Sequence, residues 1–582
     1  MAEVIIMPKL GFNMDEGKLV KWYKNEGDSV AKGEALFAIE TDKTSIDIEA
    51  TGDGVVRKLL IEEGETTPVT LPIAIVAGAD ENIDAELADA MAKLGKGDAP
   101  VAAPAAEAAP AAAAAPAAAP APAASNKDFD IIVIGGGPGG YVAAIKAAQM
   151  GKRTAIVEKE HMGGVCLNKG CIPTKALLRS AEALAEVKDS AKYGVVDLDV
   201  SNAKLDMKKV QERKKTIINQ LVGGVTGLVK GNGATLINGA GEIVDKNTVK
   251  VGDKSYTTEN IIIATGSVSK SLPIPIDSGM EVLTSTEALN LDEVPESIAI
   301  IGGGVIGIEF AYFLNSIGSK VTVIEFLDRI LPMVDEEITA QVTKQLEDMG
   351  VTIHTSAKVT EITKDSVIFE KDGKNETVAT SKVLMSVGRA PDLSGIDCEA
   401  LGIKTDRGAI VTDLTLKTSV NNIYAIGDVN AKAMLAHTAS MEGIVAVENI
   451  CGKNSTMNYD TIPSAIYLQP EIASVGLTEA QAKEKYGNVK VGRFPLLANG
   501  KAKVAGEERG LIKVIVEPKY NEIVGVHLYC IHATDMIAEA VVAMNMEATA
   551  EEIAGSIHPH PTVSEIYHEA FHAAIDKAIH FK

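Results

Sequence analysis

Cysteine and aromatic residues are scarce in this sequence of 582 residues. Only five cysteines occur, which is too few for a disulfide-stapled scaffold and is typical of a protein in a reducing cytoplasm. Phe, Trp and Tyr together make up 4% of the chain, so it offers few side chains on which nucleic-acid bases could stack. Basic residues are outnumbered by acidic ones, 56 against 79, and the net charge of −23 argues against general binding of nucleic acid or of an anionic membrane.

Long apolar runs are missing as well. Apart from an Ala tract broken by prolines, no run of ~18 apolar residues occurs, so we expect no transmembrane helix and no membrane partner. The first residues carry acids and lack a basic start with a long apolar run, so we expect no signal peptide and a cytoplasmic protein. Apolar residues still make up 46% of the chain, and its length is enough for three to five domains of ~100–200 residues.

A segment rich in Ala and Pro divides the chain. Residues 99–124 hold 18 Ala and 6 Pro, and the prolines prevent a continuous helix. We therefore predict a flexible linker over 81–127, which would reach ~80 Å if its central part is extended at ~3.1 Å per residue. Its first part, "ENIDAELADAMAKLG", either forms a short amphipathic helix or extends the linker.

The pattern differs on the two sides of the linker. Residues 1–80 hold short β-rich runs separated by Gly, Asp and Glu turns, which predicts a small all-β sandwich. After the linker, a strand, a Gly-rich turn and a helix follow one another, first from Asp130 and again from Ser297. The two copies align over some 30 residues, so one βαβ unit is repeated in the chain.

Each copy contains the motif GxGxxG, where glycines allow a tight turn and let a dinucleotide pyrophosphate approach the N-terminus of the helix. The motif glycines are Gly135, Gly137 and Gly140 in the first copy, and Gly302, Gly304 and Gly307 in the second. The alternative is a Gly-rich turn that has only a structural role and binds no ligand. Two such units together favour two dinucleotide sites, one for a bound flavin and one for an exchangeable nicotinamide cofactor.

An acidic residue ends the second strand of each copy. Glu158 lies 23 residues after Gly135, and Glu325 lies 23 residues after Gly302. A carboxylate at this place accepts hydrogen bonds from ribose hydroxyls. Glu325 would also repel a 2′-phosphate, so we expect the second site to prefer NAD(H) to NADP(H).

Two of the cysteines, Cys166 and Cys171, lie five residues apart in "GGVCLNKGCIPTK". A regular helix would place their Cα atoms ~8.6 Å apart, beyond the ~7 Å limit for a disulfide. A disulfide therefore needs a local distortion, which Gly170 could permit, and strained disulfides are the reducible ones. The alternatives are two unrelated buried thiols or a metal site, for which only His161 is a nearby further ligand.

Together with the flavin-type glycine motif, this cysteine segment resembles the flavin disulfide reductases, and most closely the dihydrolipoamide dehydrogenases, over residues 128–582. Further matching segments are "ATGS", "GGGVIGIEF", "SVGRAPD", "IYAIGDV", "MLAH" and "HPHPTVSE". The resemblance implies a multidomain protein with two Rossmann-like α/β dinucleotide-binding domains and an α+β C-terminal dimerisation domain. The implied boundaries are 128–270 with 393–460 for the FAD-binding and central part, 271–392 for the NAD-binding domain, and 461–582 for the interface domain.

The resemblance also implies roles for individual residues. Cys171 would lie against the flavin, Cys166 would exchange with the substrate, and Lys175 would pair with Glu309 near the flavin ring. Asp428 would bind the ribityl and phosphate groups of FAD. The further implied FAD-binding residues are Lys175, Thr265, Gly266, Ser267, Met434, Leu435, Ala436 and His437, and the further NAD-binding residues are Glu309, Val359 and Gly388.

The C-terminal histidines allow two interpretations. His558 and His560 each precede a proline, and a helix is predicted to begin near Thr562, so Glu565 could simply be part of a capping box. The functional alternative is a dyad in which Glu565 polarises His560, which removes a thiol proton. The family pattern favours the dyad, with the histidine supplied by the partner subunit of an obligate homodimer.

The segment "HEAFH", from His568 to His572, matches the zinc-protease pattern HExxH. The only candidate third ligand that follows is His580, and the helix belongs to a domain that the resemblance already explains. We therefore predict no metal site here.

The N-terminal segment resembles a lipoyl domain over residues 1–78, most closely those of 2-oxo acid dehydrogenase acyltransferase components. Lys43 in "ETDK" matches the lysine that carries lipoate. Asp42 and Thr44 flank it where a biotin carrier would have Met, so lipoate is favoured over biotin. Taken alone, a lysine in a turn would be an ordinary solvated charge.

The combined resemblance implies a dihydrolipoyl dehydrogenase that carries its own lipoyl arm, uses FAD, and reduces NAD⁺ with electrons from a dihydrolipoyl protein. Implied partners are the acyltransferase and decarboxylase components of a 2-oxo acid or acetoin dehydrogenase complex. Two alternatives remain: another flavin disulfide reductase, of the glutathione or mercuric reductase kind, or chiefly a lipoyl carrier subunit. Glu325 disfavours an NADPH enzyme, and the sequence lacks the acyltransferase motif HxxxDG.

Overall fold

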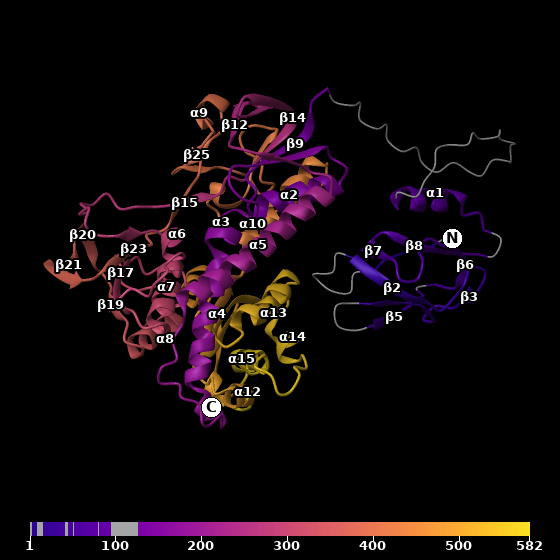
Figure 1. Cartoon of the computed structure of the whole chain (residues 1–582). Coiled ribbons are helices and arrows are strands. Elements are labelled where there is room, and N and C mark those ends of the chain that lie inside the picture. The colour runs from indigo at the N-terminus through magenta and orange to yellow at the C-terminus, as the bar shows by residue number, and fades with distance from the viewer. Residues whose placement is uncertain (1–2, 9–15, 41–44, 51, 79–80, 95–125) are drawn as a thin grey trace. The chain divides into compact units, whose positions relative to one another are not determined.

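The computed structural model describes residues 3–8, 16–40, 45–50, 52–78, 81–94 and 126–582 (Figure 1). The chain divides into two compact units, Met1–Ala121 and Pro122–Lys582. Within the described ranges, no helix combines the length and the apolar character that crossing a bilayer requires.

The first unit is a sandwich of two four-stranded antiparallel sheets. One sheet has the order β1 (Glu3–Ile6), β8 (Pro72–Ala77), β6 (Gly54–Leu59), β3 (Ser29–Val30), and the other has the order β5 (Ser45–Glu49), β4 (Ala35–Glu40), β2 (Glu16–Trp22), β7 (Thr66–Pro68). Leu19 and Phe37 of one sheet and Val56 and Ile73 of the other are fully buried in one shared core. The predicted all-β sandwich is therefore confirmed.

The helix α1 (Asp84–Lys93) follows the sandwich. Ile83 and Ala90 are buried against Ile75 and Ala77 of β8, so apolar burial holds this segment on the sheet. Of the two alternatives for this segment, the structure shows the helix. The predicted linker over 81–127 therefore began too early, because residues 81–94 belong to the folded first unit.

The first βαβ copy builds a parallel sheet in the order β11 (Thr235–Asn238), β10 (Thr154–Glu158), β9 (Phe129–Ile134), β14 (Lys254–Ile263), β27 (Ile423–Ala425). An antiparallel extension joins β14 through β13 (Thr248–Val251) and β12 (Gly241–Asp245). The helices α2 (Pro138–Gln149) and α10 (Ala436–Ile450) pack against each other beside this sheet. Figure 1 shows α3 (Gly164–Lys169), α4 (Cys171–Lys188) and α5 (Met207–Gly231) near them, and α5 returns the chain to β11 of this sheet.

The second copy builds a five-stranded parallel sheet in the order β16 (Val282–Leu283), β23 (Lys382–Met385), β17 (Ser297–Ile301), β18 (Lys320–Ile324), β19 (Thr352–His354). Its helices are α6 (Ser285–Ala288), α7 (Val305–Ser316) and α8 (Glu336–Asp348), and an antiparallel sheet of β20 (Lys358–Ile362), β21 (Ser366–Lys371) and β22 (Lys374–Ala379) follows. A short pair, β15 (Ser267–Ser269) with β24 (Arg389–Pro391), connects this part to the first sheet, and β25 (Thr405–Asp406), β26 (Ala409–Ile410) and α9 (Cys398–Leu401) follow it.

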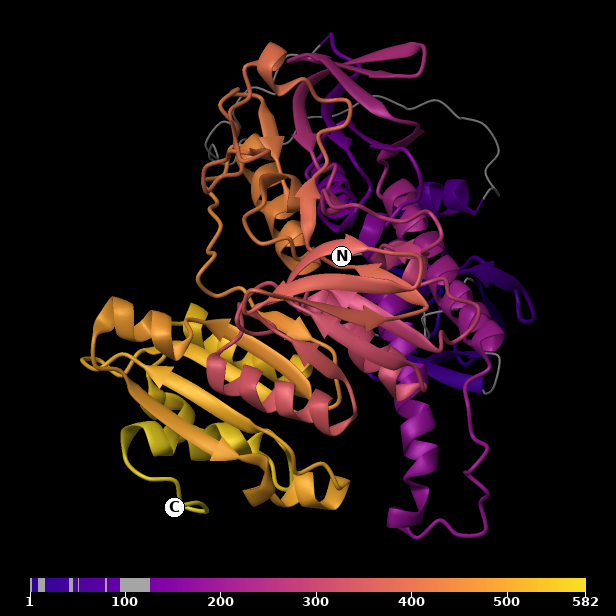
Figure 2. The same cartoon turned by 90° about the vertical axis from the view of Figure 1, so that its left-hand side faces the viewer.

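The C-terminal part is an antiparallel sheet in the order β28 (Ser464–Ile466), β29 (Glu471–Gly476), β32 (Ile523–Cys530), β31 (Leu511–Val516), β30 (Lys490–Pro495). In Figure 2 its orange and yellow strands lie beside the yellow C-terminal helices. The helices of this part are α11 (Glu479–Tyr486), α12 (Gly500–Ala505), α13 (Ala533–Asn545), α14 (Ala550–Ala554) and α15 (Glu565–Ile575). Parallel sheets followed by an antiparallel α+β domain confirm the predicted fold class.

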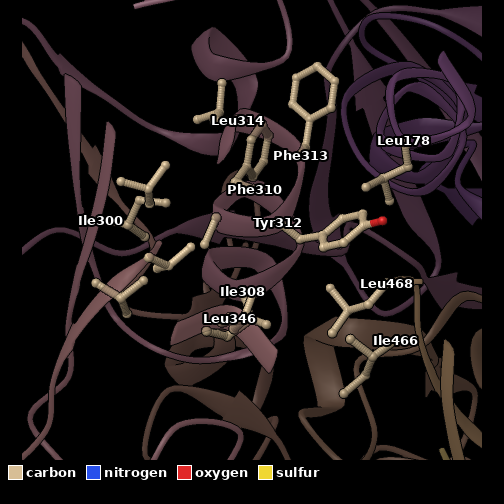
Figure 3. Packing of buried hydrophobic residues seen from close by; sticks show 14 of the residues in the cluster. Leu178, Ile300, Ile308, Phe310, Tyr312, Phe313, Leu314, Leu346, Ile466 and Leu468 are labelled. Carbon is tan, nitrogen blue, oxygen red and sulfur yellow. The ribbon is translucent and has the colours of Figure 1, made fainter. Parts of the chain in front are cut away.

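Helix α7 is the place where the three parts of the second unit meet. Figure 3 shows Tyr312 of this helix pointing to the side where Leu178 of α4 lies, while Phe310 and Phe313 point to another side. Ile300 of its own sheet and Ile466 of β28 belong to the same buried cluster. A helix that is buried on nearly all sides cannot shift easily, because interiors are close-packed. This packing fixes the position of Glu309, the only charged residue of α7.

Candidate active site

A cavity of about 1180 Å³ lies where the three parts of the second unit meet. Its walls include the first Gly-rich turn and both predicted redox cysteines, Glu309 and Phe310 of α7, and Ser464 and Tyr467 of the C-terminal part. Pockets for small ligands usually measure ~300–1,000 Å³, so this cavity has room for a dinucleotide.

The first Gly-rich turn has the shape that a pyrophosphate requires. Gly135 has a φ of +110°, and a Cβ there would lie 2.2 Å from the carbonyl oxygen of Ala264. A Cβ on Gly140 would lie 1.9 Å from the carbonyl oxygen of Gly135, so both glycines are needed for close packing. By contrast, a Cβ on Gly137 would meet no atom within 4 Å, which leaves free space at the N-terminus of α2.

The second turn repeats this geometry. Gly302 has a φ of +106° and packs against the carbonyl of Ser386, a Cβ on Gly307 would lie 2.1 Å from the carbonyl oxygen of Gly302, and the space at Gly304 is open. Each turn therefore fits one dinucleotide at the start of the helix that follows it, α2 in the first copy and α7 in the second.

The two acidic residues make a contact that the sequence did not suggest. The N–H of Gly136 donates to Oε2 of Glu158 at 2.6 Å, and the N–H of Gly303 donates to Oε2 of Glu325 in the same way. The second oxygen of each carboxylate accepts a further backbone N–H, from Glu160 and from Leu327. Each carboxylate therefore also fixes its own Gly-rich turn. Because a carboxylate has about four lone-pair sites, each of the two can still accept hydrogen bonds from ribose hydroxyls.

The cysteine pair lies at a break between two helices. Cys166 belongs to α3, Cys171 begins α4, and Gly170 between them has φ −149° and ψ −109°, which interrupts the helix as expected. A Cβ on Gly170 would lie 3.1 Å from the carbonyl oxygen of Val165, so the break leaves little room for a side chain. The break therefore brings the side chains of Cys166 and Cys171 next to each other.

The two thiols differ in acidity. The hydrogen bond from Cys166, followed by the positive charge of Lys175, lowers the pKa of Cys171 from 9.0 to about 7, against the opposing effect of burial. The same hydrogen bond, together with burial, raises the pKa of Cys166 far above its ordinary value. Cys171 is thus the more acidic thiol of the pair, and Cys166 the less acidic one.

An ion pair lies beside the cysteines. Nζ of Lys175, on α4, lies 2.8 and 2.9 Å from the two carboxylate oxygens of Glu309, on α7. The carboxylate is buried and also accepts the backbone N–H of Tyr467 at 3.0 Å. The predicted pairing of Lys175 with Glu309 is present, and Tyr467 is a neighbour that the sequence did not reveal.

Polar side chains from the β15–β24 pair and from the chain segments next to it meet at another wall of the cavity. Ser267 donates to the carboxylate of Asp428, and Arg389 donates to Oγ of Ser267 at 2.7 Å and to its carbonyl at 2.6 Å. Oγ1 of Thr265 donates to the carbonyl of Asp392 at 2.6 Å. Arg389 was missed as a site residue, although it lies inside the segment "SVGRAPD" that carried part of the resemblance.

The turn that carries Asp428 is held from behind by Glu442 of α10. This buried carboxylate accepts the N–H of Gly427, the Nδ2 of Asn430 at 3.0 Å and the hydroxyl of Tyr459 at 2.6 Å. Gly427 has a φ of +72°, so the chain turns sharply just before Asp428. Glu442 was also missed, because one acid in a helix gives no signal in a single sequence.

The remaining predicted residues of unit 2 divide into two groups. Those that line the cavity are Gly266, Met434, Leu435, Ala436 and His437, and the ring of His437 contacts the carbonyl of Pro463 at 2.8 Å. Gly388 and Val359 are not among the described residues that line the cavity. Val359 is instead buried in the core around β20. Gly388 has a φ of +102° and free space around its Cα.

Glu565 contacts both the ring of His560 and the backbone of Thr562. Its Oε1 lies 2.9 Å from Nδ1 of His560, and its Oε2 accepts the N–H of Thr562 at 2.9 Å. Burial opposes ionisation, but these two contacts outweigh it and lower the pKa of Glu565. The helix begins at Glu565 rather than near Thr562, whose hydroxyl donates to the carbonyl of Pro559 instead of capping.

His560 does not belong to the cavity of its own chain. Its side chain is 78% exposed, and it is not among the described residues that line the cavity. The imidazole is therefore oriented by Glu565 and directed to solvent on the C-terminal part, which leaves it available to a second molecule.

The histidines in and after the HExxH segment contact each other or a neighbouring carboxylate. The rings of His568 and His572 lie 4.5 Å apart, while Nδ1 of His580 contacts Glu569 at 2.7 Å. Lys43, the predicted lipoyl site, lies outside the described residues. The paired ends of β4 and β5, Glu40 opposite Ser45, flank the segment that contains it.

Three comparisons with known proteins agree with this geometry. Residues 129–443 match the family described as pyridine nucleotide-disulphide oxidoreductase, residues 462–571 match its dimerisation domain, and residues 3–76 match a family of biotin-requiring enzymes, the biotin/lipoyl domain. Together these matches cover both units.

Curated relatives share the sequence over most of its length. A dihydrolipoyl dehydrogenase of Bacillus subtilis is 45% identical over 475 residues, covering 78% of this chain and 99% of that protein. The mitochondrial dihydrolipoyl dehydrogenase of Pisum sativum is 41% identical over 466 residues, covering 78% and 92%. Among solved structures, an HOCl-induced flavoprotein disulfide reductase of Escherichia coli is similar with a TM-score of 0.68 at 29% identity, over 76% of this chain and 99% of that one.

Proposed function

Because this chain belongs to the pyridine nucleotide-disulphide oxidoreductase family, we propose that it is a dihydrolipoyl dehydrogenase. It oxidises protein-bound dihydrolipoyl groups to lipoyl groups and reduces NAD⁺ to NADH. The observation that carries this proposal is the thiol pair of Cys166 and Cys171, which lies in the cavity beside the Lys175–Glu309 ion pair.

FAD and NAD are the cofactors. The open space at Gly137, the turn at Gly135 and the wall of Ser267 and Asp428 fit FAD, and the second turn with Glu325 fits NAD. Bound FAD would relay two electrons from the dithiol to NAD⁺. The protein's part is to bind both dinucleotides, to hold the thiols and to keep a fixed charge beside them.

The acidity of the two thiols gives the direction of the exchange reaction. In thiol–disulfide exchange, attack on one sulfur expels the other as a thiolate, and the more acidic thiol is the better leaving group. A dihydrolipoyl thiolate therefore attacks Sγ of Cys166, and Cys171 leaves as the thiolate. The second dihydrolipoyl thiol then displaces Cys166, which closes the lipoyl ring. One disulfide is formed and one is broken, and the two electrons reach the Cys166–Cys171 pair.

The proton balance requires a base. His560, oriented by Glu565, accepts a proton from the dihydrolipoyl thiol, and we infer that it does so in the active site of the other subunit of a homodimer. Its exposure, and the exposed apolar side chains of Val542 on α13 and of Met546 directly after it (64% and 76%), support a partner on the C-terminal part. The match of residues 462–571 to a dimerisation domain supports the same arrangement.

The first unit is proposed to carry lipoate on Lys43, in the chain between β4 and β5. Membership of a 2-oxo acid or acetoin dehydrogenase complex in the cytoplasm, with its decarboxylase and acyltransferase components as partners, follows as a further proposal. The short tether makes the arm a candidate substrate of the same dimer, since tethering gives effective concentrations of ~mM. Lipoylated protein given NADH should then consume more NADH than its Lys43→Ala variant, whereas equal consumption would assign the arm to another enzyme.

The experiment that tests the activity is NADH formation from free dihydrolipoamide and NAD⁺, with Cys171→Ser as the inactive control. Activity in the parent and none in the variant supports a dihydrolipoyl dehydrogenase. No activity in the parent would leave the lipoyl carrier role, and a preference for NADP⁺ or for glutathione would favour another disulfide reductase.

A further inference from the structure

Tyr467 brings the C-terminal part of the unit to the ion pair beside the cysteines. It lies just after β28, and it lines the cavity next to Lys175 of α4 and Glu309 of α7. Three parts of the fold, distant in sequence, therefore contribute one residue each to a single cluster.

Tyr467 contacts both members of the ion pair in different ways. Its backbone N–H donates to Oε1 of Glu309 at 3.0 Å. Its ring lies under the ammonium of Lys175, with Nζ 4.3 Å from the ring centroid. A lysine ammonium within about 6 Å of an aromatic face is attracted to the ring, and more strongly where water is excluded.

The ring is itself anchored. The Tyr467 hydroxyl lies close to the side chain of Thr534, whose N–H and Oγ1 both donate to Glu471, at 2.9 and 2.8 Å. Burial, with Glu471 and Glu309 nearby, raises the pKa of Tyr467, so the hydroxyl stays neutral. The ring thus extends from the C-terminal sheet, and the residues around its hydroxyl belong to the same part of the unit.

Without the ring, one side of the ammonium would be open. The Lys175 side chain is 30% exposed, whereas the Glu309 side chain is 6% exposed. Water that enters beside Nζ would hydrate the ammonium and weaken its field at the thiols, because effective dielectric constants rise with hydration. The backbone N–H on Glu309 would remain, since it does not depend on the side chain at position 467.

We propose that Tyr467 is a positioning residue whose ring holds the Lys175 ammonium against Glu309 and so keeps one fixed positive charge beside the Cys166–Cys171 pair. This inference rests on the proposed function, in which FAD lies against Cys171. The proposal assigns a role to a residue of the C-terminal part, which contacts the ion pair and not the thiols.

The direction of the effect follows from the charges around Cys171. Lys175 lowers the pKa of Cys171, and Glu309 raises it by a smaller amount. Hydration weakens the fields of both groups. The loss of the stabilising field of Lys175 is larger than the loss of the opposing field of Glu309, so the net effect disfavours the thiolate. The thiolate should then form at higher pH when the ring is absent, by roughly half a pH unit to one pH unit.

The test compares variants that keep the ring with variants that remove it. Tyr467→Phe keeps the aromatic face and loses only the contact with Thr534. Tyr467→Leu and Tyr467→Met remove the face, and the flexible Met fills more of the space if Leu leaves the protein poorly folded. The full-length flavoprotein is reduced with one equivalent of dithiothreitol without oxygen, and the long-wavelength absorbance of a thiolate lying against oxidised flavin is titrated with pH.

We expect the midpoint of Tyr467→Phe to match that of the parent, and the midpoints of the Leu and Met variants to move upward by roughly half a pH unit to one pH unit. Equal midpoints in all four proteins would overturn the inference, and so would a shift in Tyr467→Phe as large as in Tyr467→Leu. A parent without this absorbance at any pH would overturn the proposed placement of the flavin itself, which distinguishes the two failures.

Discussion

The Nδ1 atom of His560 lies 2.9 Å from Oε1 of Glu565, and the other oxygen of that carboxylate accepts the N–H of Thr562. The carboxylate is thus fixed by the backbone before it orients the imidazole. Because Nδ1 is engaged, Nε2 is the nitrogen that is free to accept a proton from a thiol.

Glu565→Gln should therefore impair proton transfer while the fold is kept. The amide can still accept the N–H of Thr562, but it carries no negative charge to stabilise a protonated imidazole. We expect kcat/KM for dihydrolipoamide to fall roughly 10-fold to 100-fold, because general-base catalysis is worth about 10²–10⁴ and only part of it is lost. Steady-state kinetics with NAD⁺ in excess measures this.

A matched control is available one turn along the same helix. Glu569 contacts His580 at 2.7 Å in the same manner, but it has no proposed part in the reaction. Glu569→Gln should leave kcat/KM per folded molecule close to that of the parent. Equal losses in both variants would mean that the helix, and not the dyad, is being disturbed.

The choice of coenzyme should depend on Glu325. The parent is expected to use NADH far better than NADPH, because the carboxylate would lie near a 2′-phosphate. Glu325→Gln should lower the ratio of kcat/KM for NADH to that for NADPH by roughly tenfold. Glu158→Gln, which alters the equivalent contact in the first copy, should leave this ratio unchanged, and a parent that prefers NADPH would contradict the assignment.

Retention of FAD should depend on Glu442. Glu442→Ala leaves three donors without their acceptor, a buried one on Asn430 and partly buried ones on Gly427 and Tyr459. Each such loss costs about 1–3 kcal/mol, so the turn that carries Asp428 should loosen and FAD should dissociate roughly 10-fold to 100-fold more readily.

The measurement for Glu442 is the flavin content after gel filtration, followed by titration of the apoprotein with FAD. Glu448→Gln is the control, since Glu448 lies two turns along the same helix and contacts Lys453 and Ser455 instead of the turn. If Glu442→Ala holds FAD as tightly as this control, then the carboxylate does not support the site.

The pair of His558 and Glu539 should make stability depend on pH. Nε2 of His558 lies 2.9 Å from Oε1 of Glu539, and this hydrogen bond raises the pKa of His558 against the effect of burial. A raised pKa means that the stabilising charge is fully present below the unfolded value of about 6.5 and is lost as pH rises through the folded value.

Glu539→Gln should therefore lower the melting temperature more at pH 6 than at pH 9. The expected cost at pH 6 is at most about 1 kcal/mol, because Glu539 is partly exposed and screened by solvent. A difference in melting temperature that is the same at both pH values would contradict the ion pair.

The sequence predicted the features that depend on local geometry. The glycines at 135 and 302 have the positive φ values that a tight turn demands, and Gly170 interrupts the helix between the cysteines. The β sandwich and the repeated βαβ unit also follow from periodicities that a single sequence displays.

Contacts between distant segments were not predictable in the same way. Tyr467 reaches Glu309 across 158 positions, and Arg389 reaches Ser267 across 122. Neither residue belongs to a spaced pattern of its own, so only the packing of the domains brings them to the cavity. The start of α15 was misplaced because the hydroxyl of Thr562 bonds to Pro559, a choice that a capping pattern cannot reveal.

The central claim is that the Cys166–Cys171 pair carries the electrons, and differential alkylation with mass spectrometry tests it most directly. In the oxidised parent, the peptide should contain the two cysteines as a disulfide that resists alkylation. One equivalent of dihydrolipoamide should convert both to alkylatable thiols, and NAD⁺ should restore the disulfide while NADH appears in equal amount. If both cysteines remain free thiols throughout turnover, then electrons do not pass through this pair and the account is wrong.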